Sequence, residues 1–125
     1  MNRKGFVLIQ ENDDLIRELI ERWLAEAGYT VRARAAGDET PSLVIVDLPS
    51  PRGAQARVQA LQAVYAAPIL VLSGRFRRGL GGSIEAARRF GVRKVLPKPF
   101  TREELLAAVR ESLAASGLPE LAGPR

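Results

Sequence analysis

Five polar residues that could carry out chemistry each follow an apolar segment of this sequence. They are Glu11 and Asn12, Asp47, Ser73 and Lys98. Two carboxylates that come close together repel one another, and a divalent cation such as Mg²⁺, which prefers oxygen ligands, relieves that repulsion. With the cation bound, Asp47 can attack a phosphoryl group as a nucleophile, while the Lys98 ammonium and the Ser73 hydroxyl contact phosphoryl oxygens. These residue types therefore indicate a small polar site suited to phosphoryl transfer onto an aspartate.

The composition excludes several other chemistries. The chain of 125 residues contains no histidine and no cysteine, which removes Ser-His-Asp triads, Cys-His pairs, thiolate zinc sites and disulfides. No apolar run approaches the roughly 18 residues of a membrane span, so we expect no membrane contact. The short apolar stretch near the start favours a strand over a signal peptide, which indicates a cytoplasmic location. We expect one domain over residues 1–116 and a tail or linker stub over residues 117–125.

Segments typical of strands and of helices alternate along the chain, and these elements must position the polar residues. We predict strands at Phe6–Gln10, Tyr29–Ala35, Leu43–Asp47, Pro68–Ser73 and Val92–Leu96. We predict helices at Asp14–Ala27, about Ala54–Tyr65, about Ser83–Phe90 and from Thr101 to about Leu113. This alternation predicts an α/β fold with a parallel sheet and right-handed crossovers. In such a sheet the ligand site lies beyond the carboxyl ends of the strands, where the five residues stand.

The helix ends carry capping signals. Asp13 or Asp14 can cap the first helix, and Gly28 suits the left-handed position after its last turn. Thr101 and Glu104 form a capping box for the last helix. The helical spacing of the first helix predicts an inward face made of Leu15, Ile16, Leu19, Ile20, Trp23, Leu24 and Ala27.

Four segments, in chain order, resemble the receiver domain of bacterial response regulators. VLIQENDDLIREL resembles the first strand, acidic pair and first helix of that family, and LVIVDLPSP resembles its phosphoacceptor strand. PILVLSG resembles the fourth strand, and VLPKPF followed by TREEL resembles the fifth strand, Lys-Pro dipeptide and last helix. The resemblance covers about Phe6–Leu113. It implies a doubly wound, flavodoxin-like sheet of five parallel strands in the order 2-1-3-4-5, with a cis Lys98–Pro99 bond.

The resemblance implies a role for each site residue. Asp47 would accept the phosphoryl group from a sensor histidine kinase or phosphotransfer protein, and Lys98 and Ser73 would bind it. The ligands implied for Mg²⁺ are Glu11, Asn12, Asp47 and the backbone carbonyl of Pro49. The implied function is a two-component signalling switch that changes its affinity for a downstream protein partner or a second copy. Its chemistry would not go beyond self-phosphotransfer and autodephosphorylation at Asp47, so it is not otherwise an enzyme.

Two positions depart from the family pattern. Arg17, which in the family follows the second acid by five positions, places Asn12 rather than Asp13 among the direct Mg²⁺ ligands. Asparagine offers an oxygen but lacks one negative charge, so we expect weak Mg²⁺ binding. Val95 stands where receivers often carry a switch tyrosine or phenylalanine. These departures leave an alternative open, a degenerate receiver that acts as a phosphorylation-independent protein-interaction module.

The connection between the second and third predicted strands is short. It spans only Ala36–Ser42, where receivers place a whole helix, so the second helix is expected to be shortened or absent. We expect the sheet face beneath it to be thinly covered, and an exposed apolar face often marks an interface.

The basic residues have two interpretations. The net charge is +5, with a cluster formed by Arg75, Arg77, Arg78, Arg88, Arg89, Arg93 and Lys94. The simpler interpretation is a solvated basic face, and the other is a surface for a protein partner. Because the two tyrosines and the single tryptophan do not interleave with this cluster, nucleic-acid binding by this domain alone is not expected.

Overall fold

One parallel sheet organises the chain, and the computed structural model describes residues 5–35, 39–48, 53–74, 87–88 and 91–114. The elements in chain order are β1 (Val7–Gln10), α1 (Asp14–Glu26), β2 (Val31–Arg32), β3 (Leu43–Asp47), α2 (Ala54–Val64), β4 (Ile69–Ser73), β5 (Lys94–Pro97) and α4 (Arg102–Ala114). All neighbouring strands pair in parallel, in the order β2-β1-β3-β4-β5. The predicted doubly wound order 2-1-3-4-5 is confirmed.

Some predicted segments lie outside the described residues. The helix expected at about Ser83–Phe90 is described only at residues 87–88, which are helical. The loop that follows Gly74, the proline pair Pro49 and Pro51, and the tail at residues 117–125 are not described. None of the helices in the described part of the chain is long and apolar enough to cross a membrane.

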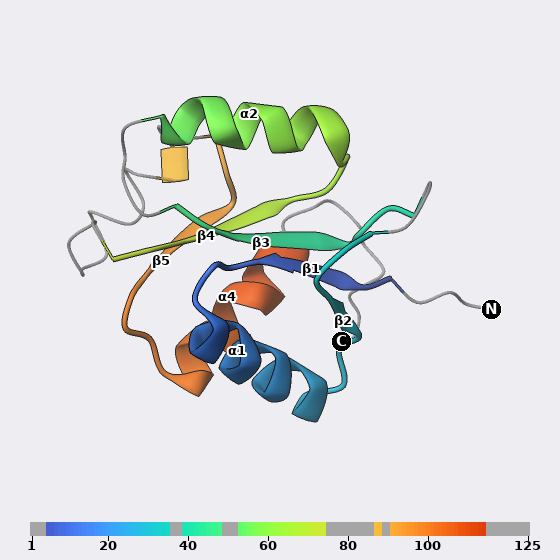
Figure 1. The fold of residues 1–125 in the computed structure, drawn as a ribbon, viewed down its shortest axis with the longest axis vertical. Helices are drawn as coiled ribbons and strands as arrows, with labels where there is room; N and C mark the ends of the chain where they lie inside the picture. Colours follow the sequence, from blue (N-terminus) through green and yellow to red (C-terminus); the bar gives the residue numbers. More distant parts are fainter. Residues whose placement is uncertain (1–4, 36–38, 49–52, 75–86, 89–90, 115–125) are drawn as a thin grey trace.

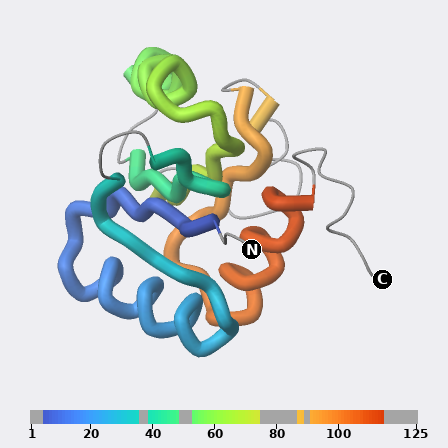
Figure 2. The backbone as a smooth tube through the Cα atoms, turned by 90° about the vertical axis from the view of Figure 1, so that its right-hand side faces the viewer, coloured from blue at the N-terminus to red at the C-terminus, as the bar shows by residue number. Residues whose placement is uncertain are grey.

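Helices cover both faces of the sheet. Figures 1 and 2 show α1 and α4 side by side on one face and α2 on the other. The side chains of β3 alternate between the two faces: Val44 and Val46 pack toward α2, whereas Leu43 and Ile45 pack toward α1 and α4. A strand that is buried on both faces reads as a continuous apolar run, which is what the sequence LVIVD shows.

The inward face of α1 is narrower than predicted. Ile20 and Leu24 are fully buried and Trp23 packs against the same cluster, but the side chain of Leu15 is 77% exposed. Leu19 and Ala27 are exposed too, so their placement on the inward face was wrong. The physical reason is that a helix lying on a sheet buries only the stripe that faces it, and helical spacing alone does not show how wide that stripe is.

The short β2–β3 connection leaves no exposed apolar sheet face among the described residues. The described part of this connection contains no helix, as predicted. Phe6 and Leu8 are nevertheless buried. The Arg32 guanidinium lies over the Phe6 ring, 4.7 Å from its centroid, and pairs with Glu39 at 2.6 Å. The expected thinly covered face was therefore wrong, because a charged side chain can cover an apolar ring with its planar head group and its methylene stem.

The element ends follow the predicted capping signals. Asp13 Oδ1 accepts hydrogen bonds from the backbone N–H groups of Leu15 and Ile16, at 2.9 and 3.1 Å. Gly28 adopts φ +97° after α1, in the left-handed region that glycine tolerates. The capping box of α4 is present, because Thr101 Oγ1 accepts from the Glu104 N–H and Glu104 Oε1 accepts from the Thr101 N–H. The second strand is shorter than its predicted range because this edge strand pairs only with β1.

Candidate functional site

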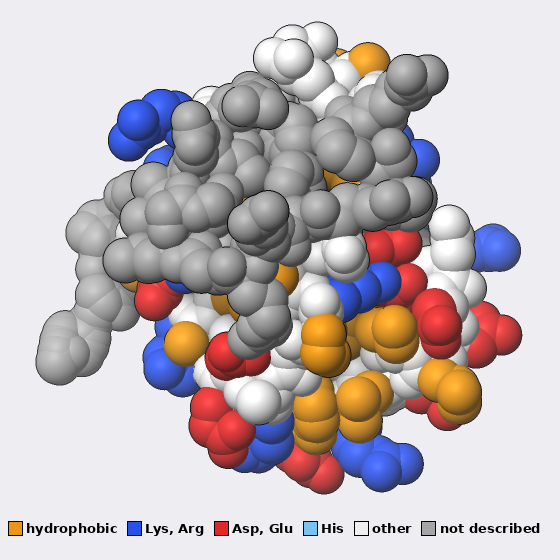
Figure 3. Space-filling model, turned by 90° about the vertical axis from the view of Figure 1, so that its left-hand side faces the viewer, with side chains coloured by type: hydrophobic (Ala, Val, Ile, Leu, Met, Phe, Trp, Pro, Cys, Tyr) orange, Lys and Arg blue, Asp and Glu red, His pale blue; other side chains and the backbone are white. Residues whose placement is uncertain are grey.

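The predicted site residues stand at the carboxyl edge of the sheet. Asp47 is the last residue of β3 and Ser73 the last of β4. Glu11 and Asn12 follow β1, and Lys98 follows β5. Figure 3 looks onto this edge: acidic and basic side chains meet there, and hydrophobic side chains gather beside them. Because the strands are parallel and in register, their ends bring together residues that are far apart in the sequence.

Lys98 joins the two carboxylates of the site. Its Nζ lies 2.8 Å from Asp47 Oδ1 and 3.1 Å from Glu11 Oε1. Its backbone N–H donates to the Ser73 carbonyl at 2.9 Å, and the Lys98–Pro99 bond is cis, as the resemblance implied. The side chains of Glu11, Asp47 and Lys98 are 1%, 11% and 19% exposed, so little water screens their charges. One ammonium therefore lies between two carboxylates that would otherwise repel each other, and it offsets one of their two charges.

The pKa of Lys98 reflects this position. Burial by itself lowers the pKa of the ammonium, but hydrogen bonds to Asp47 and Glu11 and the charges of both carboxylates raise it. The net effect is a pKa above the ordinary value of 10.5. Lys98 is therefore a stable cation at neutral pH, which suits a group that binds phosphoryl oxygens.

The carboxylate of Glu11 accepts a backbone hydrogen bond at one oxygen and pairs with Lys98 at the other. Its Oε2 accepts a hydrogen bond from the Asp13 backbone N–H at 3.0 Å, and its backbone carbonyl accepts one from Arg17 Nη1 at 3.2 Å. Its Oε1 is buried, and the Lys98 ammonium lies 3.1 Å away in an ion pair. A buried carboxylate oxygen in this state can still act as a ligand for a cation.

The donor set fits a hard divalent cation. Glu11, Asn12 and Asp47 line the same cleft, which has a volume of about 600 Å³. Two carboxylates and an amide suit Mg²⁺, which keeps several of its waters. The described residues contain no group of three or more histidine, cysteine or acidic side chains that could hold a metal ion. At this site the third side chain is the amide of Asn12. Pro49, the remaining expected ligand, lies outside the described residues.

Ser73 and Val95 are buried parts of the sheet. Ser73 is inaccessible to solvent at the end of β4 and is not among the described residues that line the cleft beside Asp47. A contact of its hydroxyl with a phosphoryl group stays a prediction. Val95 is fully buried in the cluster under α2.

One contact at the cleft was missed from the sequence. Arg57 Nη2, on α2, donates to Gln10 Oε1 at 3.2 Å, and both residues line the cleft beside Asp47. No local motif marks this pair, because the two residues belong to different elements that only the packing of α2 on the sheet brings together. From the sequence, Arg17 indicates only which residues form the acidic pair. In the structure its Nη1 also donates a hydrogen bond to the Glu11 carbonyl.

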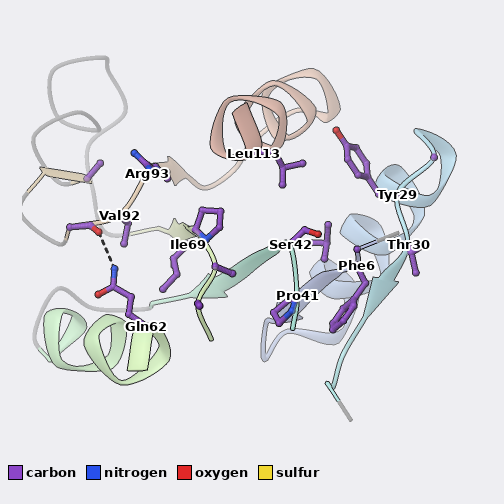
Figure 4. A pocket seen from close by; sticks show the side chains of 18 of the residues that line it. Phe6, Tyr29, Thr30, Pro41, Ser42, Gln62, Ile69, Val92, Arg93 and Leu113 are labelled. Atoms are coloured by element: carbon purple, nitrogen blue, oxygen red, sulfur yellow. Dashed lines mark hydrogen bonds between the residues drawn. The ribbon is translucent and has the colours of Figure 1, made fainter. Parts of the chain in front are cut away.

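A larger cavity opens at the opposite edge of the sheet. Its volume is about 1100 Å³, and Figure 4 shows it between Phe6, Pro41, Ile69, Val92 and Leu113. A Gln62 side-chain amide donates to the Gly91 carbonyl along one wall. None of the predicted site residues lines this cavity. The candidate site is therefore chosen by the convergence of charged groups at the carboxyl edge and not by cavity size.

Known proteins with similar sequences are response regulators and transcriptional regulators. The transcriptional regulatory protein GltR of Pseudomonas aeruginosa is 30% identical over 133 residues, covering 94% of this chain and 52% of GltR. The response regulator MprA of Mycobacterium ulcerans is 32% identical over 127 residues, covering 91% of this chain and 52% of MprA. The chain thus spans about half the length of these curated relatives. No family model matches the chain.

Solved structures with the same fold include receiver proteins. A response regulator receiver protein from Burkholderia phymatum superposes with a TM-score of 0.68 at 25% identity, covering 89% of this chain and 96% of that one. A response regulator from Burkholderia pseudomallei, solved with a phosphorylated aspartic acid, a calcium ion and citrate, has a TM-score of 0.59 at 26% identity and covers 93% of this chain and 76% of that one. With the strand order and the carboxyl-edge site, these likenesses place the chain in the response regulator family, as a receiver domain.

Proposed function

We propose that this chain is a phosphorylation switch in which Asp47 accepts a phosphoryl group from the phosphohistidine of a sensor histidine kinase or phosphotransfer protein. The observation that carries the proposal is the contact of one lysine with two acids: Lys98 Nζ lies 2.8 Å from Asp47 Oδ1 and 3.1 Å from Glu11 Oε1. Lys98 thereby places a cation where phosphoryl oxygens would arrive.

The transfer itself is an in-line displacement. An oxygen of the Asp47 carboxylate attacks phosphorus, an O–P bond forms, and the N–P bond of the phosphohistidine breaks with its electron pair leaving on the imidazole. Lys98 would hold one phosphoryl oxygen and Ser73 another. Glu11, Asn12 and Asp47, with the Pro49 carbonyl, would hold Mg²⁺, which when bound neutralises charge on the transferring group. The calcium ion and phosphorylated aspartic acid in the Burkholderia pseudomallei regulator support this assignment by analogy.

The output would be a changed affinity for a downstream protein or a second copy of the chain. Phosphorylation adds negative charge and oxygen acceptors to Asp47, so the Lys98 ammonium would turn from the two carboxylates toward the phosphoryl group. Because the backbone N–H of Lys98 is bonded to the Ser73 carbonyl, this change would reach the ends of β4 and β5. Val95, fully buried, supplies no aromatic rotamer to such a switch.

The test is the intact mass of the protein after incubation with Mg²⁺ and acetyl phosphate. The wild type is expected to gain one phosphoryl group, and Asp47→Asn is expected to gain none. Asp14→Asn, which changes an exposed acid near the same edge, is the matched control and should label like the wild type. Labelling of Asp47→Asn would overturn the assignment of Asp47. An unlabelled wild type with unchanged partner binding in Asp47→Asn would instead support a phosphorylation-independent interaction module.

A further inference from the structure

The cleft beside Asp47 extends toward α2 and the β2–β3 connection. Besides Glu11, Asn12 and Asp47, it is lined by Gln10 from the end of β1, Ala33 from just after β2, and Gly53, Ala54 and Arg57 from the start of α2. Lys98 approaches Asp47 from the β5 end instead. The cleft therefore offers a second direction from which a charged group can reach the phosphoacceptor.

Arg57 supplies such a group. Its guanidinium donates one hydrogen bond, from Nη2 to Gln10 Oε1 at 3.2 Å, and no acidic side chain of the described residues forms an ion pair with it. A guanidinium has five N–H donors in a planar fork that matches the oxygens of a phosphoryl group. Among the described residues only Gln10 accepts a hydrogen bond from this fork, so within that part of the chain most of its donors are left for a ligand.

Arg57 is the cation of the cleft lining that no acidic side chain of the described residues pairs with. Arg17, the other arginine that lines the cleft, is already paired with Asp14 at 2.8 Å. Asn12 contributes no charge, so the acids that line the cleft among the described residues are Glu11 and Asp47, and both are engaged by Lys98. The start of α2 adds backbone N–H groups, since no side-chain hydrogen bond caps this helix at Gly53.

We propose that Arg57 is a phosphoryl-binding residue, which holds phosphoryl oxygens from the cleft beside Asp47 that Lys98 does not line. This inference rests on the proposed function and adds a specific cation to it. Because Asn12 weakens Mg²⁺ binding, Arg57 supplies part of the positive charge that Mg²⁺ would give to the phosphoryl group. Phosphorylation of Asp47 therefore needs less Mg²⁺ with Arg57 present than without it.

The test compares Arg57→Gln with Arg110→Gln, which removes the same charge from an exposed position on α4. Initial rates of phosphorylation are measured by intact mass over a range of acetyl phosphate concentrations and, separately, over a range of Mg²⁺ concentrations. Arg57→Gln is expected to raise the half-saturating acetyl phosphate concentration roughly tenfold, and to raise the Mg²⁺ requirement, whereas Arg110→Gln matches the wild type. Arg57→Lys, which keeps the charge without the fork, should lie between the two. Thermal unfolding of each variant confirms that the fold is retained.

A second measurement separates this inference from the proposed function. Inorganic phosphate is titrated into the unphosphorylated protein, and the amide signals of Gly53 and Ala54 are followed by NMR. Shifts in the wild type that are lost in Arg57→Gln support the anion site even if Asp47 takes no phosphoryl group. Equal phosphate affinity in both proteins, or labelling of Arg57→Gln indistinguishable from Arg110→Gln, would overturn the role of Arg57. A wild type that never labels would overturn the proposed function alone.

Discussion

The Lys98 ammonium lies 2.8 Å from the Asp47 carboxylate, and the same ammonium reaches Glu11 at 3.1 Å. Glu11, Asp47 and Lys98 follow or end three different strands, so their contact depends on the strand order of the sheet. Before any ligand arrives, the one ammonium offsets one of the two carboxylate charges, and the three groups keep one net negative charge. A ligand that binds the Lys98 ammonium in place of the carboxylates must be anionic. A ligand that binds the two carboxylates in place of Lys98 must be cationic.

The contribution of Lys98 to stability should depend on pH. Its pKa is raised above 10.5 in the folded chain, because the bonds and charges of Asp47 and Glu11 outweigh burial. A raised pKa on folding gives stability that is complete below the unfolded pKa and lost as pH rises through the folded one. The free energy of unfolding lost in Lys98→Gln should therefore be constant up to about pH 10 and shrink above it.

Urea unfolding of the wild type and of Lys98→Gln, from neutral to strongly alkaline pH with a chelator present, measures the free energy of unfolding that the substitution removes. Lys94→Gln is the control, because Lys94 pairs with Glu111 on the surface, at 2.9 Å, and should contribute little at any pH. A loss that grows with rising pH would contradict the ion-pair arrangement around Lys98.

Restoring an acid at position 12 should strengthen metal binding. Asn12→Asp adds one negative charge beside Glu11 and Asp47, and we expect Mg²⁺ affinity to rise roughly tenfold after desolvation offsets most of the Coulombic gain. Isothermal titration with Mg²⁺ measures the change. Asp13→Asn keeps a cap for α1 but removes the neighbouring acid, and it should leave the Mg²⁺ affinity nearly unchanged. A larger effect at position 13 would mean that the register set by Arg17 is wrong.

Asp13 and Asp14 should differ in their effect on stability. Asp13 caps α1 through two backbone hydrogen bonds, so Asp13→Ala should lower the free energy of unfolding by about 1 kcal/mol. The side chain of Asp14 is 81% exposed and pairs with Arg17 on the surface, so Asp14→Ala should cost less than about 0.5 kcal/mol. Urea denaturation of the two variants distinguishes them, and equal costs would argue against Asp13 as the cap.

The contact between the Arg32 guanidinium and the Phe6 ring should give a measurable coupling free energy. Arg32 lies 4.7 Å from the Phe6 ring centroid, and a cation–π contact at a partly exposed site contributes about 0.5–1 kcal/mol. A double-mutant cycle with Arg32→Gln and Phe6→Leu should return a coupling of this size. Glu39→Gln, which removes only the ion-pair partner of Arg32, should have a smaller effect. A coupling near zero would mean that other groups cover this face.

The sequence by itself was sufficient for the order of elements and for most of the site. Continuous apolar runs such as Leu43–Asp47 are diagnostic of strands buried on both faces, and parallel strands place their carboxyl ends on one edge. Glu11, Asp47 and Lys98 could therefore be predicted to meet. Local capping signals were equally sufficient, since Thr101 and Glu104 satisfy each other within one turn.

Only the tertiary structure decided how wide each buried face is and which distant groups meet. Leu15 lies outside the buried stripe of α1 although its spacing is helical, because burial depends on what packs against the helix. Arg57 reaches Gln10, and Arg32 covers Phe6, through contacts between elements that no local pattern encodes. Propensity and periodicity act over a few residues, whereas these contacts depend on how α2 and the β2–β3 connection pack on the completed sheet.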